Sequence, residues 1–297
     1  MFNISPVTAV WIAWFATAAN LVIGKAAVPY VTSALFLLLA CLAAGVFFLP
    51  YLLKNNNWKI LTQKDVWPQC LAMGTFGTAL PMTVFMIALN YTTPVNGAIL
   101  NQFEIIYSLI MSYLILKERP TLRQMGGSVL IILGVGLLLW QAGTTIQLKG
   151  DLMIIGCLWM FQLSHIFAKK LPAHMEPQLI SAARALFAVP ALAVLVAYLA
   201  VFRGPLMFES NATLWSMLIL CAFANYFLGN TYWYRAIRNM DLSKATAIIL
   251  SYPVMTFILS VCLGQDTISI YKVLGMILAV GGAYVVTGIV KQQGEKK

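Results

Sequence analysis

Residues 96–139 read NGAILNQFEIIYSLIMSYLILKERPTLRQMGGSVLIILGVGLLL, and the architecture can be worked out from this stretch. An apolar run from Val95 to Ile115 carries one acidic residue, Glu104, near its middle. A charged connection follows, and a second apolar run then holds Gly127 and Gly134. A carboxylate deep in an apolar segment costs free energy and by default indicates function. The stretch therefore predicts two membrane helices, with a functional carboxylate at the centre of the first.

The composition of the chain excludes a soluble fold. Hydrophobic residues make up 61% of it and charged residues 9%, against about 25% charged residues in soluble domains. We therefore predict an all-α integral membrane protein. The five cysteines lie in or beside apolar runs without a CxxC pair, and we interpret them as small apolar side chains rather than disulfide or metal ligands.

Ten apolar segments approach the roughly 20 residues that a bilayer-spanning helix needs. The predicted spans are Val7–Ala27, Val31–Leu53, Val66–Leu89, Val95–Leu116, Leu122–Trp140, Leu152–Ala168, Leu179–Val201, Leu214–Tyr234, Leu242–Leu263 and Ile270–Val290. The connections between them are short, which leaves no room for a soluble catalytic or ligand-binding domain.

The positions of Lys and Arg predict the orientation in the membrane. With the N-terminus in the cytoplasm, fourteen of these residues fall in inner segments and three in outer ones, while Lys25 and Arg184 lie within spans. This distribution satisfies the positive-inside rule. We expect a multi-pass protein of the bacterial inner (plasma) membrane, with both termini in the cytoplasm. The net charge of +10 follows from this topology, so no nucleic acid partner is expected.

The chain also contains an internal duplication. Gly127 and Gly134 recur as Gly275 and Gly282, 148 positions later, which is half the length of the chain. We predict two five-helix repeats, residues 1–148 and 149–297. Because five spans per repeat is an odd number, the second repeat enters the membrane from the opposite side. Such inverted repeats are typical of secondary transporters, although a duplication can also serve only to build a stable bundle.

Residues in both halves resemble the drug/metabolite transporter superfamily, in its EamA-like branch. Trp14, Asn20 and Lys25 resemble the first-span pattern of that family, Ala88–Pro94 its third-span end, and Glu104 its fourth-span motif. In the second half, Gly150-Asp151-Leu152, Arg184 and the segment Ala236–Asp266 match in the same order. The resemblance implies ten spans, two inverted repeats and transport of amino acids, sugars, nucleotide derivatives, drugs or other small metabolites.

One departure from the family pattern concerns the helix that carries Glu104. The family places a proline after this glutamate, but this chain has Ile105 there, while Pro253 stands at the matching position of the second half. We therefore expect the fourth span to be less kinked than the ninth.

Glu104 is the leading candidate for the functional site. It lies ten residues after Pro94, or about 15 Å along a helix, near the middle of the membrane. Asn101 and Tyr107 share its face of the helix. Two roles fit this carboxylate: it binds and releases a proton during transport, or it pairs with a cationic group such as a substrate ammonium. A protonated glutamate that only bonds a neighbouring helix is the structural alternative.

Polar and aromatic residues of other spans complete the expected cavity. The predicted substrate-binding residues are Glu104, Asn101, Tyr107, Phe76, Trp159, Asn225, Tyr226, Ser251, Tyr252 and Asn20. Candidate coupling or charge groups are Glu104, His165, Lys25 and Arg184, and the predicted hinges are Pro81 and Pro253.

Several of these residues have a second interpretation. Lys25 either reaches the outer membrane surface or binds an anionic substrate group. For Arg184, reaching the inner surface or pairing with a carboxylate is favoured over substrate contact, and His165 is favoured as a packed hydrogen-bonding residue. Tyr234 is expected in the interfacial aromatic belt.

The function predicted from these features is secondary transport by alternating access. The chain has two histidines, no HExxH and no P-loop, so we expect neither an enzyme nor an ATP-driven pump, and no cofactor or metal. The first choice is export of a small amphipathic metabolite such as an amino acid, with the proton as a possible coupling ion. Uptake of a scarce metabolite or nucleotide derivative is the alternative, and a receptor or scaffold is the other class. The oligomeric state, monomer or homodimer, stays open.

Overall fold

The computed structural model describes residues 4–116, 121–141, 145–169, 171–172, 174–239, 249 and 251–287. Within these ranges the chain is helical, and the one pairing of β type is an isolated bridge between Val31 and Phe208. The α-helices are α1 (Pro6–Ala27), α2 (Ser33–Leu53), α3 (Trp58–Leu61), α4 (Trp67–Gly74), α5 (Leu80–Ala88), α6 (Pro94–Leu100), α7 (Glu104–Leu116), α8 (Leu122–Gln141), α9 (Thr145–Lys169), α10 (Pro177–Leu186), α11 (Ala188–Phe202), α12 (Ala212–Leu220), α13 (Asn230–Asn239), α15 (Tyr252–Cys262) and α16 (Ile270–Thr287).

Five helical segments are long and apolar enough to cross a membrane: Pro6–Ala27, Ser33–Leu53, Trp67–Ala88, Pro177–Phe202 and Ala212–Ala236. Shorter apolar helices cover Leu122–Leu137, Tyr252–Cys262 and Ile270–Val285. Every predicted span contains helix in its described part, so the all-helical membrane architecture is confirmed. The number of crossings, ten, stays a prediction, and most of the ninth span before Ser251 lies outside the described residues.

The fourth predicted span is interrupted just before its carboxylate. A 3₁₀ turn at Asn101–Phe103 separates α6 from α7, and Glu104 is the first residue of α7. The start of α6 is fixed by Pro94 in its first turn and by Thr93, whose hydroxyl accepts a hydrogen bond from the amide of Asn96 at 3.2 Å. The stretch that reads as one apolar run is therefore two helices joined by a short turn at the site.

Two wider, π-helical segments occur at matching places in the two halves. Thr75–Ala79 joins α4 to α5, and Cys221–Gly229 joins α12 to α13. The offset of 148 residues that relates the glycines places the first segment inside the second. Pro81 follows the first segment, in the opening turn of α5, and Pro253 likewise lies in the opening turn of α15. Local π-helix inside an α-helix is frequent at functional sites.

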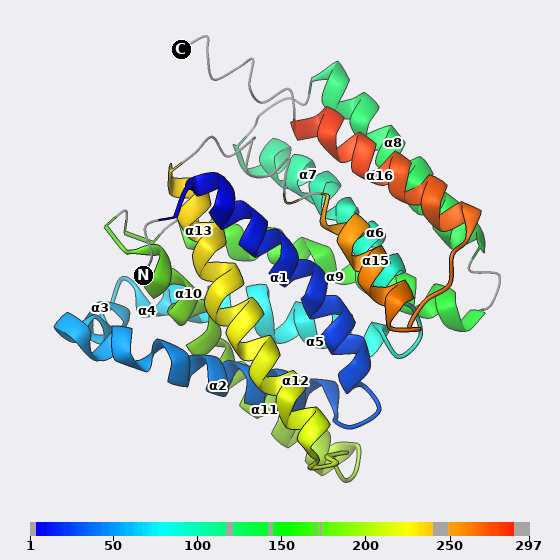
Figure 1. Cartoon of the computed structure of the whole chain (residues 1–297). Helices are drawn as coiled ribbons and strands as arrows, with labels where there is room; N and C mark the ends of the chain where they lie inside the picture. Colours follow the sequence, from blue (N-terminus) through cyan, green and yellow to red (C-terminus); the bar gives the residue numbers. More distant parts are fainter. Residues whose placement is uncertain are drawn as a thin grey trace.

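The most extensive contact between the halves is made by α8 and α16, which lie side by side in Figure 1. A Cβ atom at Gly134 would lie 2.7 Å from the backbone nitrogen of Ala279 and from the carbonyl oxygen of Gly275. In the same way, a Cβ atom at Gly282 would lie 2.6 Å from the carbonyl oxygen of Gly127. Because the earlier glycine of each helix meets the later glycine of the other, the two helices run antiparallel.

The other contacts between the halves also come in matching pairs. The first helix, α1, packs on the α12–α13 segment, and its counterpart α9 packs on the α4–α5 segment. The α6–α7 segment likewise contacts α9, and α15 contacts α1. A second set of contacts, between α2 and the α10–α11 segment, forms the larger apolar core.

Two features of the side chains refine the sequence analysis. All five cysteines are free, four of them buried and Cys262 exposed. Tyr234 is 7% exposed and packs in the larger core, so its predicted place in an interfacial belt is wrong. The amphipathic pattern could not distinguish a belt from a core position, because both take tyrosine beside apolar residues.

Candidate functional site

Glu104 is bonded across the boundary between the halves. Its Oε1 atom accepts a hydrogen bond of 2.7 Å from Nε2 of Gln162, which lies in α9. Residue 104 is partly buried, at the point where α7 begins. An amide donor satisfies a carboxylate oxygen without neutralising the charge of the group.

Tyr252 supplies the second contact between the halves. It is 4% exposed, and its hydroxyl donates to the carbonyl oxygen of Ala98 at 3.2 Å. The same hydroxyl interacts with the side chain of Asn101, and Glu104 is close enough to act on it electrostatically. Asn101, Glu104 and Tyr252, which the sequence analysis proposed separately, therefore lie together.

Trp14 and Ser251 form the third contact. The indole Nε1 of Trp14 in α1 donates to the Ser251 hydroxyl at 2.9 Å, and Ser251 directly precedes α15. We call the group Trp14, Asn101, Glu104, Gln162, Ser251 and Tyr252 the Glu104 site. It draws on both halves of the chain and combines one carboxylate, two amides, two hydroxyls and two aromatic rings.

Arg184 belongs to a different cluster. Its guanidinium donates to the carbonyl oxygen of Gly77 at 2.7 Å and to the Thr78 hydroxyl at 3.2 Å, both in the first π-helical segment. Among the described residues it has no carboxylate within ion-pair distance. The predicted pairing with a carboxylate is therefore not found. Instead, the guanidinium binds a backbone carbonyl at the π-helical widening of the α4–α5 segment.

Tyr226 and Asn225 belong to the second π-helical segment, and Asn20 contacts it from α1. Tyr226 is 2% exposed and packs beside Cys41 and Cys221, within electrostatic reach of Arg184. Asn20 of α1 accepts a long contact of 3.3 Å from the Cys221 thiol. These residues form a second polar region, and no contact that the structure describes connects it to Glu104.

The remaining predicted residues are placed elsewhere. Phe76 stacks on Phe167 with 6.4 Å between ring centroids, and Tyr107 packs edge-on against Phe103 at 5.7 Å. Trp159 is 37% exposed. The Lys25 ammonium donates to the carbonyl oxygens of Leu89 and Thr92. The side chain of His165 lies outside the described residues.

The partner of Glu104 was not among the predicted site residues. Gln162 stands in an apolar segment, and an amide in that setting requires a hydrogen-bonding partner. That signal was available in the sequence. Its pairing with Glu104 was not, because the two residues are 58 positions apart in different halves.

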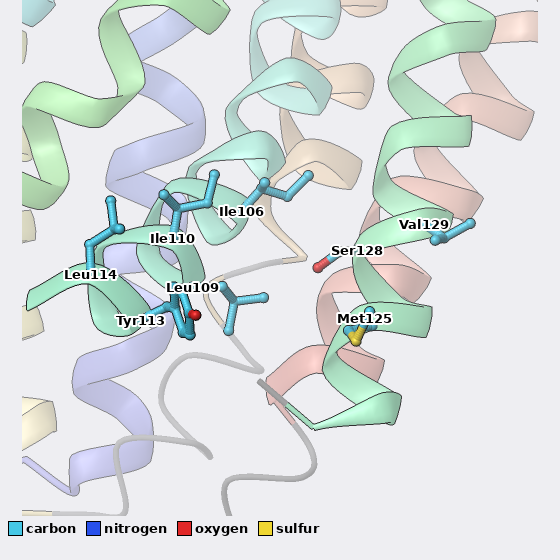
Figure 2. Close-up of a pocket in the computed structure, with 8 residues that line it drawn as sticks. All are labelled: Ile106, Leu109, Ile110, Tyr113, Leu114, Met125, Ser128 and Val129. Atoms are coloured by element: carbon cyan, nitrogen blue, oxygen red, sulfur yellow. The ribbon is translucent and has the colours of Figure 1, made fainter. Parts of the chain in front are cut away.

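An apolar groove lies apart from these polar clusters, between α7 and α8 (Figure 2). Its volume is about 360 Å³. It is lined by Ile106, Leu109, Ile110, Tyr113, Leu114, Met125, Ser128 and Val129. Glu104 is not among the lining residues, and Tyr113 and Leu114 are more than half exposed, so the groove opens on the outer surface of the bundle.

An apolar helical bundle with a polar site between its two halves is the arrangement expected of a transporter built from repeats. The chain belongs to the EamA-like transporter family, whose sequence model matches residues 4–140 and again residues 148–288. It is therefore an integral, multi-pass membrane protein that acts as a transporter.

Individual relatives agree with this assignment. The chain is 24% identical over 255 residues to the uncharacterized transporter YyaM of Bacillus subtilis (strain 168), covering 84% of this chain and 82% of YyaM. It is 26% identical over 282 residues to the uncharacterized transporter YetK of the same organism, covering 92% and 84%. One crystal structure shares the fold over 97% of this chain and 99% of its own, with a TM-score of 0.65 and 18% identity.

Proposed function

We propose that this protein is a secondary transporter that works by alternating access and binds its substrate at the Glu104 site. The observation that carries the proposal is the Glu104–Gln162 hydrogen bond of 2.7 Å, which joins the two halves through a carboxylate. Transporters built from repeats place their substrate and coupling-ion sites near mid-membrane, at the interface between repeats.

The packing of α8 against α16 supports an inverted relation between the halves. The two helices occupy the same position in each half, run antiparallel, and exchange equivalent glycine contacts. Two equivalent helices that run in opposite directions are expected when the two repeats, residues 1–148 and 149–297, have opposite orientations in the membrane. Rocking of one repeat against the other then exposes the Glu104 site to each side in turn.

Glu104 is the group proposed to bind the cation. The carboxylate can exchange its hydrogen bond with the Gln162 amide for one to a substrate ammonium, or take up a proton. Both events reduce the negative charge at the site and so lower the cost of moving it through an apolar environment.

The substrate class proposed first is an amino acid or a related amphipathic metabolite that is exported across the bacterial inner membrane. Its ammonium would bind Glu104, and its apolar part would pack on the rings of Trp14 and Tyr252, which border the same site. The driving force sets the direction of transport, so export is tested by flux and not by orientation alone.

The test is flux in proteoliposomes. Purified protein is assayed with a panel of amino acids, nucleotide derivatives and sugars, at two pH values, with the unsubstituted chain and with Glu104→Gln. We expect flux of at least one amino acid. In Glu104→Gln, either this flux or its dependence on pH should be lost. The matched control is Glu209→Gln, which removes an exposed carboxylate in the connection before α12.

Flux of nucleotide derivatives with none of the amino acids would overturn the substrate class. Unchanged flux and unchanged pH dependence in Glu104→Gln would overturn the role of the carboxylate. No flux of any compound, by a protein that remains folded, would favour a receptor or scaffold.

A further inference from the structure

A buried polar network closes the end of the bundle where α6 and α9 begin. Asp151 of α9 is fully buried, and one of its carboxylate oxygens accepts a hydrogen bond of 2.5 Å from the Thr92 hydroxyl. Its side chain also interacts with Asn96, which is 3% exposed in the first turn of α6. A carboxylate of the second half is thereby held by two residues of the first half.

Two lysines and a second carboxylate lie around this contact. Lys272 forms an ion pair with Asp266, and their side chains are 6% and 1% exposed. Lys272 also acts on Asp151, and Lys25 on Asp266, through electrostatic attraction. The network thus contains two anions and two cations, and its charges balance.

Side chains also bind backbone carbonyl groups at the same end of the bundle. The side-chain amide of Gln265 donates to the carbonyl oxygen of Val22 in α1 at 3.1 Å, and Lys25 donates to two carbonyl oxygens beyond the end of α5. A Cβ atom at Gly150 would lie 2.8 Å from the carbonyl oxygen of Ala88, so the second turn of α9 is in direct contact with the end of α5. These contacts leave little free space between the ends of α1, α5, α6 and α9.

The position of the network relates it to the Glu104 site. Asn96 and Glu104 lie on consecutive helices of one segment, eight residues apart, which is about 12 Å of helix. The network therefore lies between the Glu104 site and the end of the bundle that the positive-inside rule assigns to the outside of the cell.

We propose that Thr92, Lys25, Asp151, Asp266 and Lys272 form an outer latch, which holds this end shut and must open for the Glu104 site to reach the outside. The inference rests on the proposed alternating access.

The balance of charge explains how such a latch opens and closes. Buried ions lose their hydration, and their attraction to each other compensates only when every partner is present. Opening hydrates all four charged groups of the network, so the closed and open states can lie close in free energy. Removing one partner leaves an unpaired group buried in the closed state alone, and this shifts the population towards the open state.

The experiment is hydrogen–deuterium exchange of the full-length protein in lipid nanodiscs, which needs no knowledge of the substrate. The variant Thr92→Val keeps the shape of the side chain and removes its hydroxyl, whereas Thr92→Ser keeps the hydroxyl. We expect Thr92→Val to raise exchange at residues 88–97 and 264–272 by about tenfold, as for loss of a hydrogen bond to a charged group. Thr92→Ser should remain close to the unsubstituted protein.

A second readout separates a latch from a local structural contact. If the outer end opens, the opposite end closes, so exchange around Tyr51 and Glu176 should fall in Thr92→Val. These two side chains are joined by a 2.8 Å hydrogen bond between α2 and the residue that precedes α10. Asp151→Asn should shift both ends in the same directions, and Glu209→Gln, an exposed carboxylate outside the network, should shift neither.

Exchange that rises at the outer end without a fall at the opposite end would overturn the latch and leave a local structural role. Equal exchange in Thr92→Val and Thr92→Ser would overturn it as well. The outcome is independent of the proposed function: opposite shifts without measurable flux would support the latch and contradict transport of the compounds assayed. Measurable flux with unchanged exchange would support transport and contradict the latch.

Discussion

Substitution of Gly134 by alanine should separate α8 from α16. The added Cβ would lie 2.7 Å from two backbone atoms of α16, in Ala279 and Gly275. Favourable contact between such atoms begins at about 3.5 Å, so the helices must move apart by roughly 0.8 Å. Backbone atoms cannot rotate away as a side chain can, and overpacking of this kind costs about 1–3 kcal/mol.

The chain supplies its own control on the same helix. Gly136 lies two residues further along α8, and a Cβ atom there would meet nothing within 4 Å. Gly136→Ala should be neutral or stabilising by up to about 1 kcal/mol, because alanine has the higher helix propensity. The pair Gly282→Ala and Gly281→Ala repeats the comparison on α16, where only Gly282 is in close contact.

The assay is thermal unfolding in a fixed detergent, with the transition temperature followed by loss of tertiary fluorescence or by aggregation. We expect Gly134→Ala and Gly282→Ala to unfold several degrees below the unsubstituted protein, since about 1 kcal/mol corresponds to roughly 2–4 °C in a protein larger than 150 residues. The double variant should lose less than the combined single losses, because the first substitution already separates the helices. If Gly134→Ala is as stable as Gly136→Ala, the close packing of these helices is not what holds them together.

Three further substitutions test the polar contacts. Gln162→Leu removes the donor to Glu104 and should lower stability by about 1–3 kcal/mol at neutral pH, with partial recovery in Glu104→Gln/Gln162→Leu, as measured by thermal unfolding. Tyr252→Phe should cost about 1 kcal/mol through loss of the hydrogen bond to Ala98, and a change below 0.3 kcal/mol would argue against that bond. Arg184→Lys should not restore the stability lost in Arg184→Gln, because a lysine cannot reproduce the forked contact with Gly77 and Thr78; equal stability of Arg184→Lys and the unsubstituted chain contradicts this.

The sequence was sufficient for the class of the protein, and it named four of the six residues that the structure brings together in the proposed Glu104 site. Composition and segment length required a helical membrane protein, and the position of Glu104 in its apolar run made it the leading candidate for a functional residue. Membership of the EamA-like family confirms the resemblance, which was found in residues of both halves that match the family pattern in the same order. The roles proposed for individual residues stay predictions.

The hydrogen-bonding partners of Glu104 and Arg184 could not be predicted from the sequence. Gln162 bonds to Glu104, and Arg184 bonds to Gly77, across several intervening helices, and no pattern in the sequence links the two ends. The 3₁₀ turn before Glu104 and the two π-helical segments were also not foreseen, because their sequences have ordinary helical composition. Tertiary context routinely overrides local helix propensity, so such forms cannot be read from composition.

From its residues alone, the chain specifies that it crosses a membrane, that it is duplicated, and that Gly134 and Gly282 are equivalent. Only the packed helices show that these glycines touch the opposite half, that Lys25 binds backbone carbonyls, and that Asp151 is held by Thr92. The physical reason is that lipid tails are as apolar as leucine, so hydropathy shows that a helix is buried in the bilayer but not which face meets protein. That choice depends on close packing and hydrogen bonds between segments distant in sequence.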